Sequence, residues 1–116
     1  TKPYGYSLFN LDAMATLCQI LSTPQDNLWA YKTADGKSIQ KGITFLYPYL
    51  TDKSKWPLKP DVMYWTEWPV AQPALVFGAN AFKEIQWFRT WAGLNHQPQV
   101  EEVIRNLVIK YPIIWL

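Results

Sequence analysis

Apolar residues recur at helical spacing in the first part of the chain. Residues 7–21 are mostly apolar, and Ser7 and Asn10 suit the first turn of a helix that runs to about Leu21. Gly5 permits a backbone turn just ahead of it. Because so many positions are apolar, we expect this helix to be nearly surrounded by protein. A separate polar stripe follows spacings of four and three residues and consists of Asp12, Thr16 and Gln19.

A second helix is predicted after a turn at residues 35–36 and runs to about Tyr47. Ser38 is a plausible N-cap for it. Pro48 marks its end or a kink, because proline disrupts the helical hydrogen-bond ladder. One face of this segment is apolar at helical spacing and carries Ile39, Ile43, Leu46 and Leu50.

Two further helical segments follow in residues 72–94. Residues 72–82 read as a helix with Pro73 tolerated in its first turn, and residues 83–94 continue it or form another helix. Gly78 inside the first of these runs suggests the close approach of another backbone. A buried stripe is expected in the second run, made of Ile85, Phe88, Trp91 and Ala92.

The end of the chain adds one helix and an apolar tail. A helix is predicted from Pro98 to about Leu107, with Glu101 and Glu102 in its first turn, where negative charge complements the helix dipole. Residues 108–116 are expected to be extended and to pack onto other protein. With no convincing alternation typical of strands, the chain is predicted to be all-α and built of helical hairpins.

The connection from Thr51 to Pro69 is rich in tryptophan and lysine and is predicted to be loop-like. Long connections in compact proteins are often functional. Trp56, Trp65 and Trp68 could simply anchor an irregular segment, and we favour this interpretation for each residue taken singly. Alternatively, tryptophan and lysine beside a cleft would suit an anionic sugar polymer, because indoles stack on sugar rings and lysines screen charge.

Composition narrows the function classes further. The chain has 116 residues and a net charge of +2, without a basic tract or a phosphate-binding glycine loop, so nucleic acid is disfavoured as a partner. No apolar run is long enough for a membrane span. The single cysteine, Cys18, is predicted to be a small buried side chain, and no ligand cluster has metal-coordination spacing. A first helix this apolar and a first residue other than methionine suggest a piece of something larger.

Two stretches and the apolar ending in Trp115 carry a family resemblance. The stretches are Tyr4–Met14, read YGYSLFNLDAM, and Glu67–Pro73, read EWPVAQP. Together they resemble the C-terminal part of the alginate lyase family of helical polysaccharide lyases, over nearly the whole chain. The resemblance implies part of an (α/α) toroid, an incomplete barrel of helical hairpins, with residues 1–116 as the C-terminal segment of one lyase domain.

The resemblance also implies site residues. In that family a tyrosine at the start of a late helix acts on the substrate, and Tyr6 matches it, with Tyr4 as the near competitor. We expect Tyr4, Asn10, Trp65 and Trp68 to bind substrate. The family's Asn-His pair and arginine would lie upstream of this chain, so its N-terminal remainder is the expected partner and the segment alone should be inactive. His96 does not match the catalytic histidine and is predicted to be a surface loop residue.

The implied activity is cleavage of alginate or a related polyuronate by β-elimination, in the periplasm or outside the cell, without cofactor or metal. A glucuronan-specific lyase is the nearest alternative. A non-catalytic helical carbohydrate-binding module, in which Tyr6 and the tryptophans only stack on sugars, is an alternative of another class. The simplest alternative is an interaction fragment whose apolar faces meet the rest of its own fold.

Overall fold

The computed structural model describes residues 1–116, and its regular elements are helical, which confirms the all-α prediction. Five α-helices form: α1 (Pro3–Leu21), α2 (Ile39–Thr51), α3 (Pro73–Phe82), α4 (Ile85–Gly93) and α5 (Glu101–Arg105). Short 3₁₀ turns η1 to η4 lie at Leu28–Ala30, Lys53–Lys55, Trp65–Glu67 and Pro112–Trp115. None of the helices combines the length and the apolar character that a bilayer span requires.

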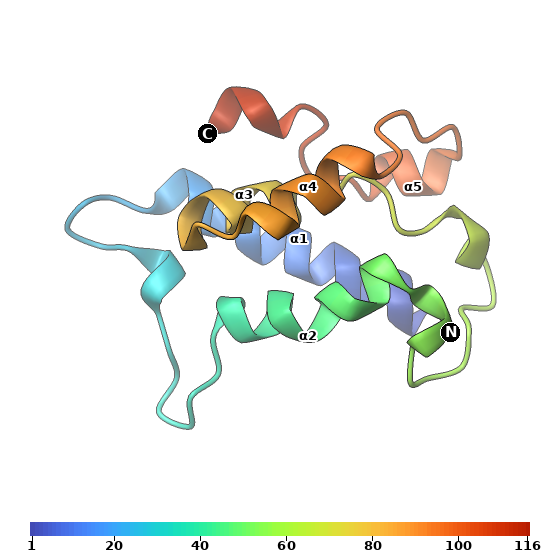
Figure 1. Ribbon diagram of the computed structural model, residues 1–116, viewed down its shortest axis with the longest axis horizontal. Coiled ribbons are helices and arrows are strands. Elements are labelled where there is room, and N and C mark those ends of the chain that lie inside the picture. Colours follow the sequence, from blue (N-terminus) through green and yellow to red (C-terminus); the bar gives the residue numbers. More distant parts are fainter.

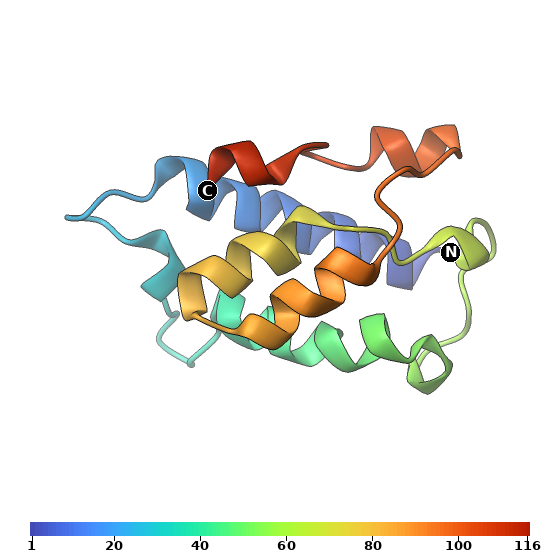
Figure 2. The same ribbon diagram turned by 45° about the horizontal axis from the view of Figure 1, so that its top comes forward.

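The four longer helices form two antiparallel hairpins (Figure 1). α1 and α2 run in opposite directions, as do α3 and α4, and α3 packs against both helices of the first hairpin. The chain after α5 returns along the molecule toward the end of α1 that carries Gln19 (Figure 2). There Gln19 Nε2 donates a hydrogen bond of 2.7 Å to the Trp115 carbonyl. Helical hairpins are therefore present, and their arrangement as part of a toroid remains a prediction.

α3 is the centre of the core. Every residue from 73 to 79 is buried, and Pro73 begins the helix as predicted. A Cβ on Gly78 would lie 2.6 Å from Ile43 Cδ1 of α2. The expected close approach at Gly78 is thus made by a side chain and not by another backbone, because the Ile43 methyl fills the space above the glycine.

α1 differs from its prediction in two ways. It begins at Pro3 and continues through Gly5, so the turn predicted at Gly5 is wrong. One side of the helix is also open, which corrects the expectation that protein surrounds it. The exposed apolar side chains of α1 are Phe9, Met14, Leu17, Ile20 and Leu21. By contrast, the polar residues Asp12 and Thr16 are buried, because α3 packs on their side of the helix.

The second hairpin and the tail need further corrections. In α4 the buried residues are Trp87 and Trp91, whereas Ile85, Phe88 and Ala92 of the predicted stripe are exposed. α5 is five residues long, shorter than the predicted helix to Leu107. The tail contacts α1 and α3, but Pro112–Trp115 form a 3₁₀ turn, so the extended conformation predicted for residues 108–116 is wrong in that part.

Several local predictions are confirmed. The Ser38 side chain accepts a hydrogen bond of 3.2 Å from the Lys41 amide and caps α2, whose predicted apolar face is buried. The predicted end of this helix near Tyr47 is wrong, however, because Pro48 lies inside α2 and the helix continues to Thr51. Cys18 is buried and unpaired, and His96 is exposed.

Candidate active site

The first turn of α1 is held by a carboxylate from a distant loop. Pro3 occupies the first helical position, where its missing N–H costs nothing. The next two amides donate to Asp61, from Tyr4 at 2.9 Å and from Gly5 at 2.8 Å. The Tyr6 amide donates to the Lys2 carbonyl at 3.0 Å. The amide donors at this helix end are therefore occupied, and they are not free to bind an anionic substrate.

Gly5 is required by the packing at this turn. A Cβ at this position would lie 3.0 Å from Trp68 Nε1 and 3.2 Å from Asp61 Oδ2. Both neighbours are buried, so neither has free space to move into. The loop that carries Asp61 and Trp68 can approach the helix because position 5 has no side chain.

Tyr6 lies on the solvent side of this turn. Its side chain is 52% exposed, and the Lys2 ammonium nitrogen lies 5.0 Å from the centre of its ring. The same nitrogen lies 5.4 Å from the ring centre of Tyr64, which adopts the left-handed conformation with φ 63°. Hydrogen bonding to Glu102, and then to Tyr6, raises the pKa of Lys2, so this cation stays charged beside the phenol.

Tyr4, the competing tyrosine, lies in the interior. It is fully buried, and its hydroxyl donates to the Tyr49 carbonyl at 2.7 Å. The rings of Trp56 and Trp65 contact it edge-on at centroid distances of 5.1 and 5.2 Å. Burial, and secondarily the charge of Asp61, raise the pKa of Tyr4 well above its usual range. Tyr4 offers no solvent-facing surface to a ligand, so the geometry favours Tyr6 as the reactive phenol.

The structure separates the other expected substrate-binding residues. Asn10 is exposed on the same side of α1 as Tyr6, one turn further on. Trp68 is buried against Gly5, with 4% of its surface exposed. Trp65 is half-buried against Tyr4, and the Lys53 ammonium lies 4.5 Å from the centre of its ring. Only Asn10 and part of Trp65 are thus open to a ligand.

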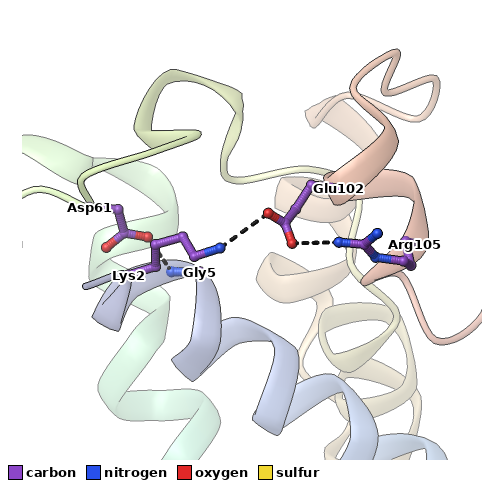
Figure 3. A network of polar contacts seen from close by, with 5 residues as sticks. All are labelled: Lys2, Gly5, Asp61, Glu102 and Arg105. Carbon is purple, nitrogen blue, oxygen red and sulfur yellow. Dashed lines mark hydrogen bonds and ion pairs between the residues drawn. The ribbon is translucent and has the colours of Figure 1, made fainter.

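Three charged residues, Lys2, Glu102 and Arg105, meet near the start of α1 (Figure 3). Lys2 Nζ donates to Glu102 Oε2 at 3.1 Å, and an Arg105 guanidinium nitrogen donates to Glu102 Oε1 at 2.9 Å. The hydrogen bond from Lys2, and also that from Arg105, lower the pKa of Glu102, which stays ionised. Sequence reasoning missed this cluster. The i,i+3 spacing of Glu102 and Arg105 was a readable signal, but their contact with Lys2 joins opposite ends of the chain.

No cavity is lined by Tyr6. Four hollows lie on the surface, and Asn10 lines one of about 220 Å³ between α1 and α2. The largest, about 460 Å³, lies between the end of α4 and the tail, where His96 and Trp91 line it. His96 Nε2 is 3.1 Å from the Ala92 carbonyl. The candidate site is therefore an open surface and not an enclosed pocket.

No group of three or more His, Cys, Asp or Glu side chains lies close enough together to hold a metal ion. Lys2 supplies a cation beside Tyr6, and Asn10 supplies an exposed amide donor one turn further on. This arrangement suits proton transfer and the binding of an anionic group.

Comparison with known proteins gives one family match. Residues 1–56 match the family model described as alginate lyase. The match covers α1 and α2, and it stops before the EWPVAQP stretch and the Trp115 ending, whose resemblance remains a prediction. Searches of curated proteins and of solved structures gave no match. The part of the chain that carries Lys2, Tyr4, Tyr6 and Asn10, residues 1–56, is therefore similar to the alginate lyase family.

Proposed function

We propose that this chain forms part of a polysaccharide lyase that cleaves alginate or a related polyuronate by β-elimination, with Tyr6 as the general acid or base. One observation carries the proposal. Within the segment that matches the family, Tyr6 is the tyrosine whose phenol is half exposed beside a charged lysine, whereas Tyr4 is buried.

The reaction needs three groups. The proton on C5 of a uronate is weakly acidic until its carboxylate is neutralised, so a lyase supplies a cationic clamp, a base for C5 and an acid for the departing O4. A phenol has an ordinary pKa of about 10, so it is protonated at neutral pH and can act as the acid. A nearby cation favours phenolate and so suits the base role. The Lys2 ammonium lies 5.0 Å from the centre of the Tyr6 ring.

Asn10 and Trp65 would contribute binding. Asn10 lies one turn from Tyr6 with its amide in solvent, apart from a weak contact of 3.9 Å with Met14 Sδ. It is free to hydrogen-bond a sugar hydroxyl. Trp65 presents the part of its ring that is not covered by Tyr4. Because the tyrosine lies on an open surface, we infer that the N-terminal remainder of the same fold supplies the other wall of the groove and the remaining catalytic groups.

The exposed face of α1 supports this inference. Phe9, Met14 and Leu17 are 40 to 56% exposed on one helix, which is unusual for a soluble domain that acts alone. With that remainder missing, the segment by itself should be inactive. An acidic polysaccharide is an extracellular polymer, so the proposed location of the enzyme is the periplasm or outside the cell.

The test uses the longest natural chain that contains residues 1–116. The ultraviolet absorbance of unsaturated uronate is followed on a panel of polyuronates that includes alginate and glucuronan. Tyr6→Phe should lower turnover by at least about 10²-fold, because the variant cannot transfer the proton. Tyr31→Phe is the matched control, since Tyr31 is 66% exposed at a distant loop, and it should keep full turnover.

Normal turnover in Tyr6→Phe would sink the assignment of Tyr6. A signal on glucuronan alone would favour the glucuronan-specific alternative. Binding of a polyuronate without any unsaturated product would favour the non-catalytic carbohydrate-binding module. The open surface around Tyr6 is the observation that keeps this second candidate in consideration.

A further inference from the structure

The carboxylate of Glu102 lies between two cations and uses one oxygen for each (Figure 3). Oε2 accepts from Lys2 at 3.1 Å and Oε1 accepts from Arg105 at 2.9 Å. The side chains of Lys2 and Glu102 are 20% and 16% exposed, so this pair is largely shielded from water. Charge-assisted hydrogen bonds of this kind are about twice as strong as neutral ones. The Arg105 side chain is 67% exposed, so the two cations form a seat for one carboxylate that is shielded at Lys2 and open to solvent at Arg105.

This seat is next to the candidate reactive group. The Lys2 ammonium that binds Glu102 also lies over the ring of Tyr6, and Tyr64 flanks it on another side. Any carboxylate that binds Lys2 is therefore held close to the Tyr6 phenol. The chemistry that Tyr6 is proposed to perform requires a neutralised substrate carboxylate at such a place.

α5 has an anchor in the core other than Glu102. Val103 is fully buried and anchors the helix in the core. The hydrogen bond between Lys2 and Glu102 is the one that joins α5 to the start of α1. Glu102 can therefore leave the seat while Val103 keeps α5 docked.

From this geometry we infer that Lys2 and Arg105 form the binding site for a uronate carboxylate of the substrate, and that Glu102 occupies this site when substrate is absent. The identity of the ligand rests on the proposed function. Glu102 and a uronate present the same group, a planar carboxylate with one negative charge, to the same two cations. Because Glu102 is tethered beside the seat, its effective concentration there is high and it competes with the substrate.

The competition holds over the neutral pH range. Glu102 is ionised there, since its pKa is lowered by Lys2 and Arg105, and so is a uronate. Removal of the Glu102 charge should free both cations for the substrate. Glutamine keeps the shape of the side chain, but it has one acceptor and no charge, so it cannot satisfy Lys2 and Arg105 together.

The experiment compares Glu102→Gln with Glu101→Gln. Glu101 is the exposed neighbour in the same helix turn and makes no ion pair, so both variants change the net charge equally. The affinity for a short alginate oligosaccharide is measured by titration calorimetry on the longest natural chain. Glu102→Gln should bind about tenfold more tightly than the wild type, whereas Glu101→Gln should stay within about twofold.

Equal affinities in the two variants, or weaker binding by Glu102→Gln, would show that Glu102 only positions Lys2, and would overturn the inference. Absence of binding by all three proteins would overturn it as well. If Glu102→Gln does not fold, the carbon-13 signal of the Glu102 carboxylate is followed in the wild type during the titration. The signal should shift as the sugar displaces the side chain, and an unchanged signal at saturation would contradict displacement.

These outcomes differ from a failure of the proposed function. A wild type that binds the oligosaccharide and gains affinity in Glu102→Gln, yet yields no unsaturated product, would refute the lyase reaction and leave the carboxylate site in place. Turnover with no effect of Glu102→Gln on binding would support the lyase and refute this site.

Discussion

α1 and α3 begin in the same way, yet the two carboxylates that cap them have different surroundings. Each helix has proline at its first position, and each is capped by an aspartate from a distant part of the chain. Asp61 accepts from two amides of α1, those of Tyr4 and Gly5. Asp12 accepts from one amide of α3, that of Ala74 at 3.0 Å, and from the Gln72 side chain at 3.1 Å.

The two carboxylates differ in whether a cation lies near their negative charge. Asp12 is fully buried without a cation, and burial raises its pKa to about 7, although hydrogen bonds from Gln72 and Ala74 oppose the shift. The side-chain amide oxygen of Gln72, Oε1, is buried without a partner. At α1, Lys53 lies near Asp61: burial lowers the pKa of Lys53, and the charge of Asp61 partly offsets this. The Asp12 cap in the core is therefore sensitive to pH, whereas the Asp61 cap holds its loop against α1 beside the candidate site.

The largest expected effect concerns the pH dependence set by Asp12. Because its pKa is about 7 when folded and 3.8 is its ordinary value, the native state binds the extra proton between these pH values. The free energy of unfolding should then fall as pH rises from about 4 to about 7, by on the order of 4 kcal/mol. Asp12→Asn should remove most of this fall, measured by urea unfolding with tryptophan fluorescence at several pH values.

Asp61→Asn is the control for that experiment, because it changes a cap of the same type. If Asp12→Asn keeps the wild-type pH dependence over this window, the buried carboxylate is not its source. The comparison between the two caps would then lose its electrostatic basis.

The next effect is the loss of stability in Asp61→Asn at pH 7. Asparagine offers one acceptor oxygen to the two amides of Tyr4 and Gly5, so one buried donor loses its partner. The charge beside the positive end of the helix is lost as well. The free energy of unfolding should fall by about 2–3 kcal/mol in urea unfolding. A value close to zero would mean that water replaces the cap.

The smallest expected effect on stability concerns Gly5, which occupies the third position of α1 as Leu75 does in α3. Gly5→Ala should lower the free energy of unfolding by about 1–2 kcal/mol, because the new Cβ meets Trp68 and Asp61. Gly93→Ala is the matched control, since nothing lies within 4 Å of a Cβ there at the end of α4. It should leave stability unchanged or raise it by up to about 1 kcal/mol. Equal effects of the two substitutions would contradict the close approach at Gly5.

Local signals predicted much of the secondary structure. The serine cap and apolar face of α2, and the proline that begins α3, follow from chemistry within one helical turn. The proline at position 3 was an equally good signal for the start of α1. Gly5 and Ser7, which are typical of a turn and a cap, predict a later start than the observed one at Pro3. The helix forms through Gly5 because Asp61, 56 residues away, supplies the missing cap.

The candidate site likewise has features that the sequence predicted and features that it did not. The YGYSLFNLDAM stretch by itself pointed to Tyr6 and to the family that residues 1–56 match. It did not distinguish the surroundings of the two tyrosines, because Tyr4 is buried by Trp56 and Trp65 from a later loop. Nor could it place Glu102 beside Lys2, 100 residues away.

The sequence alone thus determined the helical class, the main helices and the identity of the candidate phenol, since these depend on side chains within a few residues of one another. The tertiary structure decided which tyrosine faces solvent, which carboxylate caps which helix and which carboxylate pairs with Lys2 beside Tyr6. Those features depend on contacts between segments far apart in the chain, and no local pattern encodes such a contact.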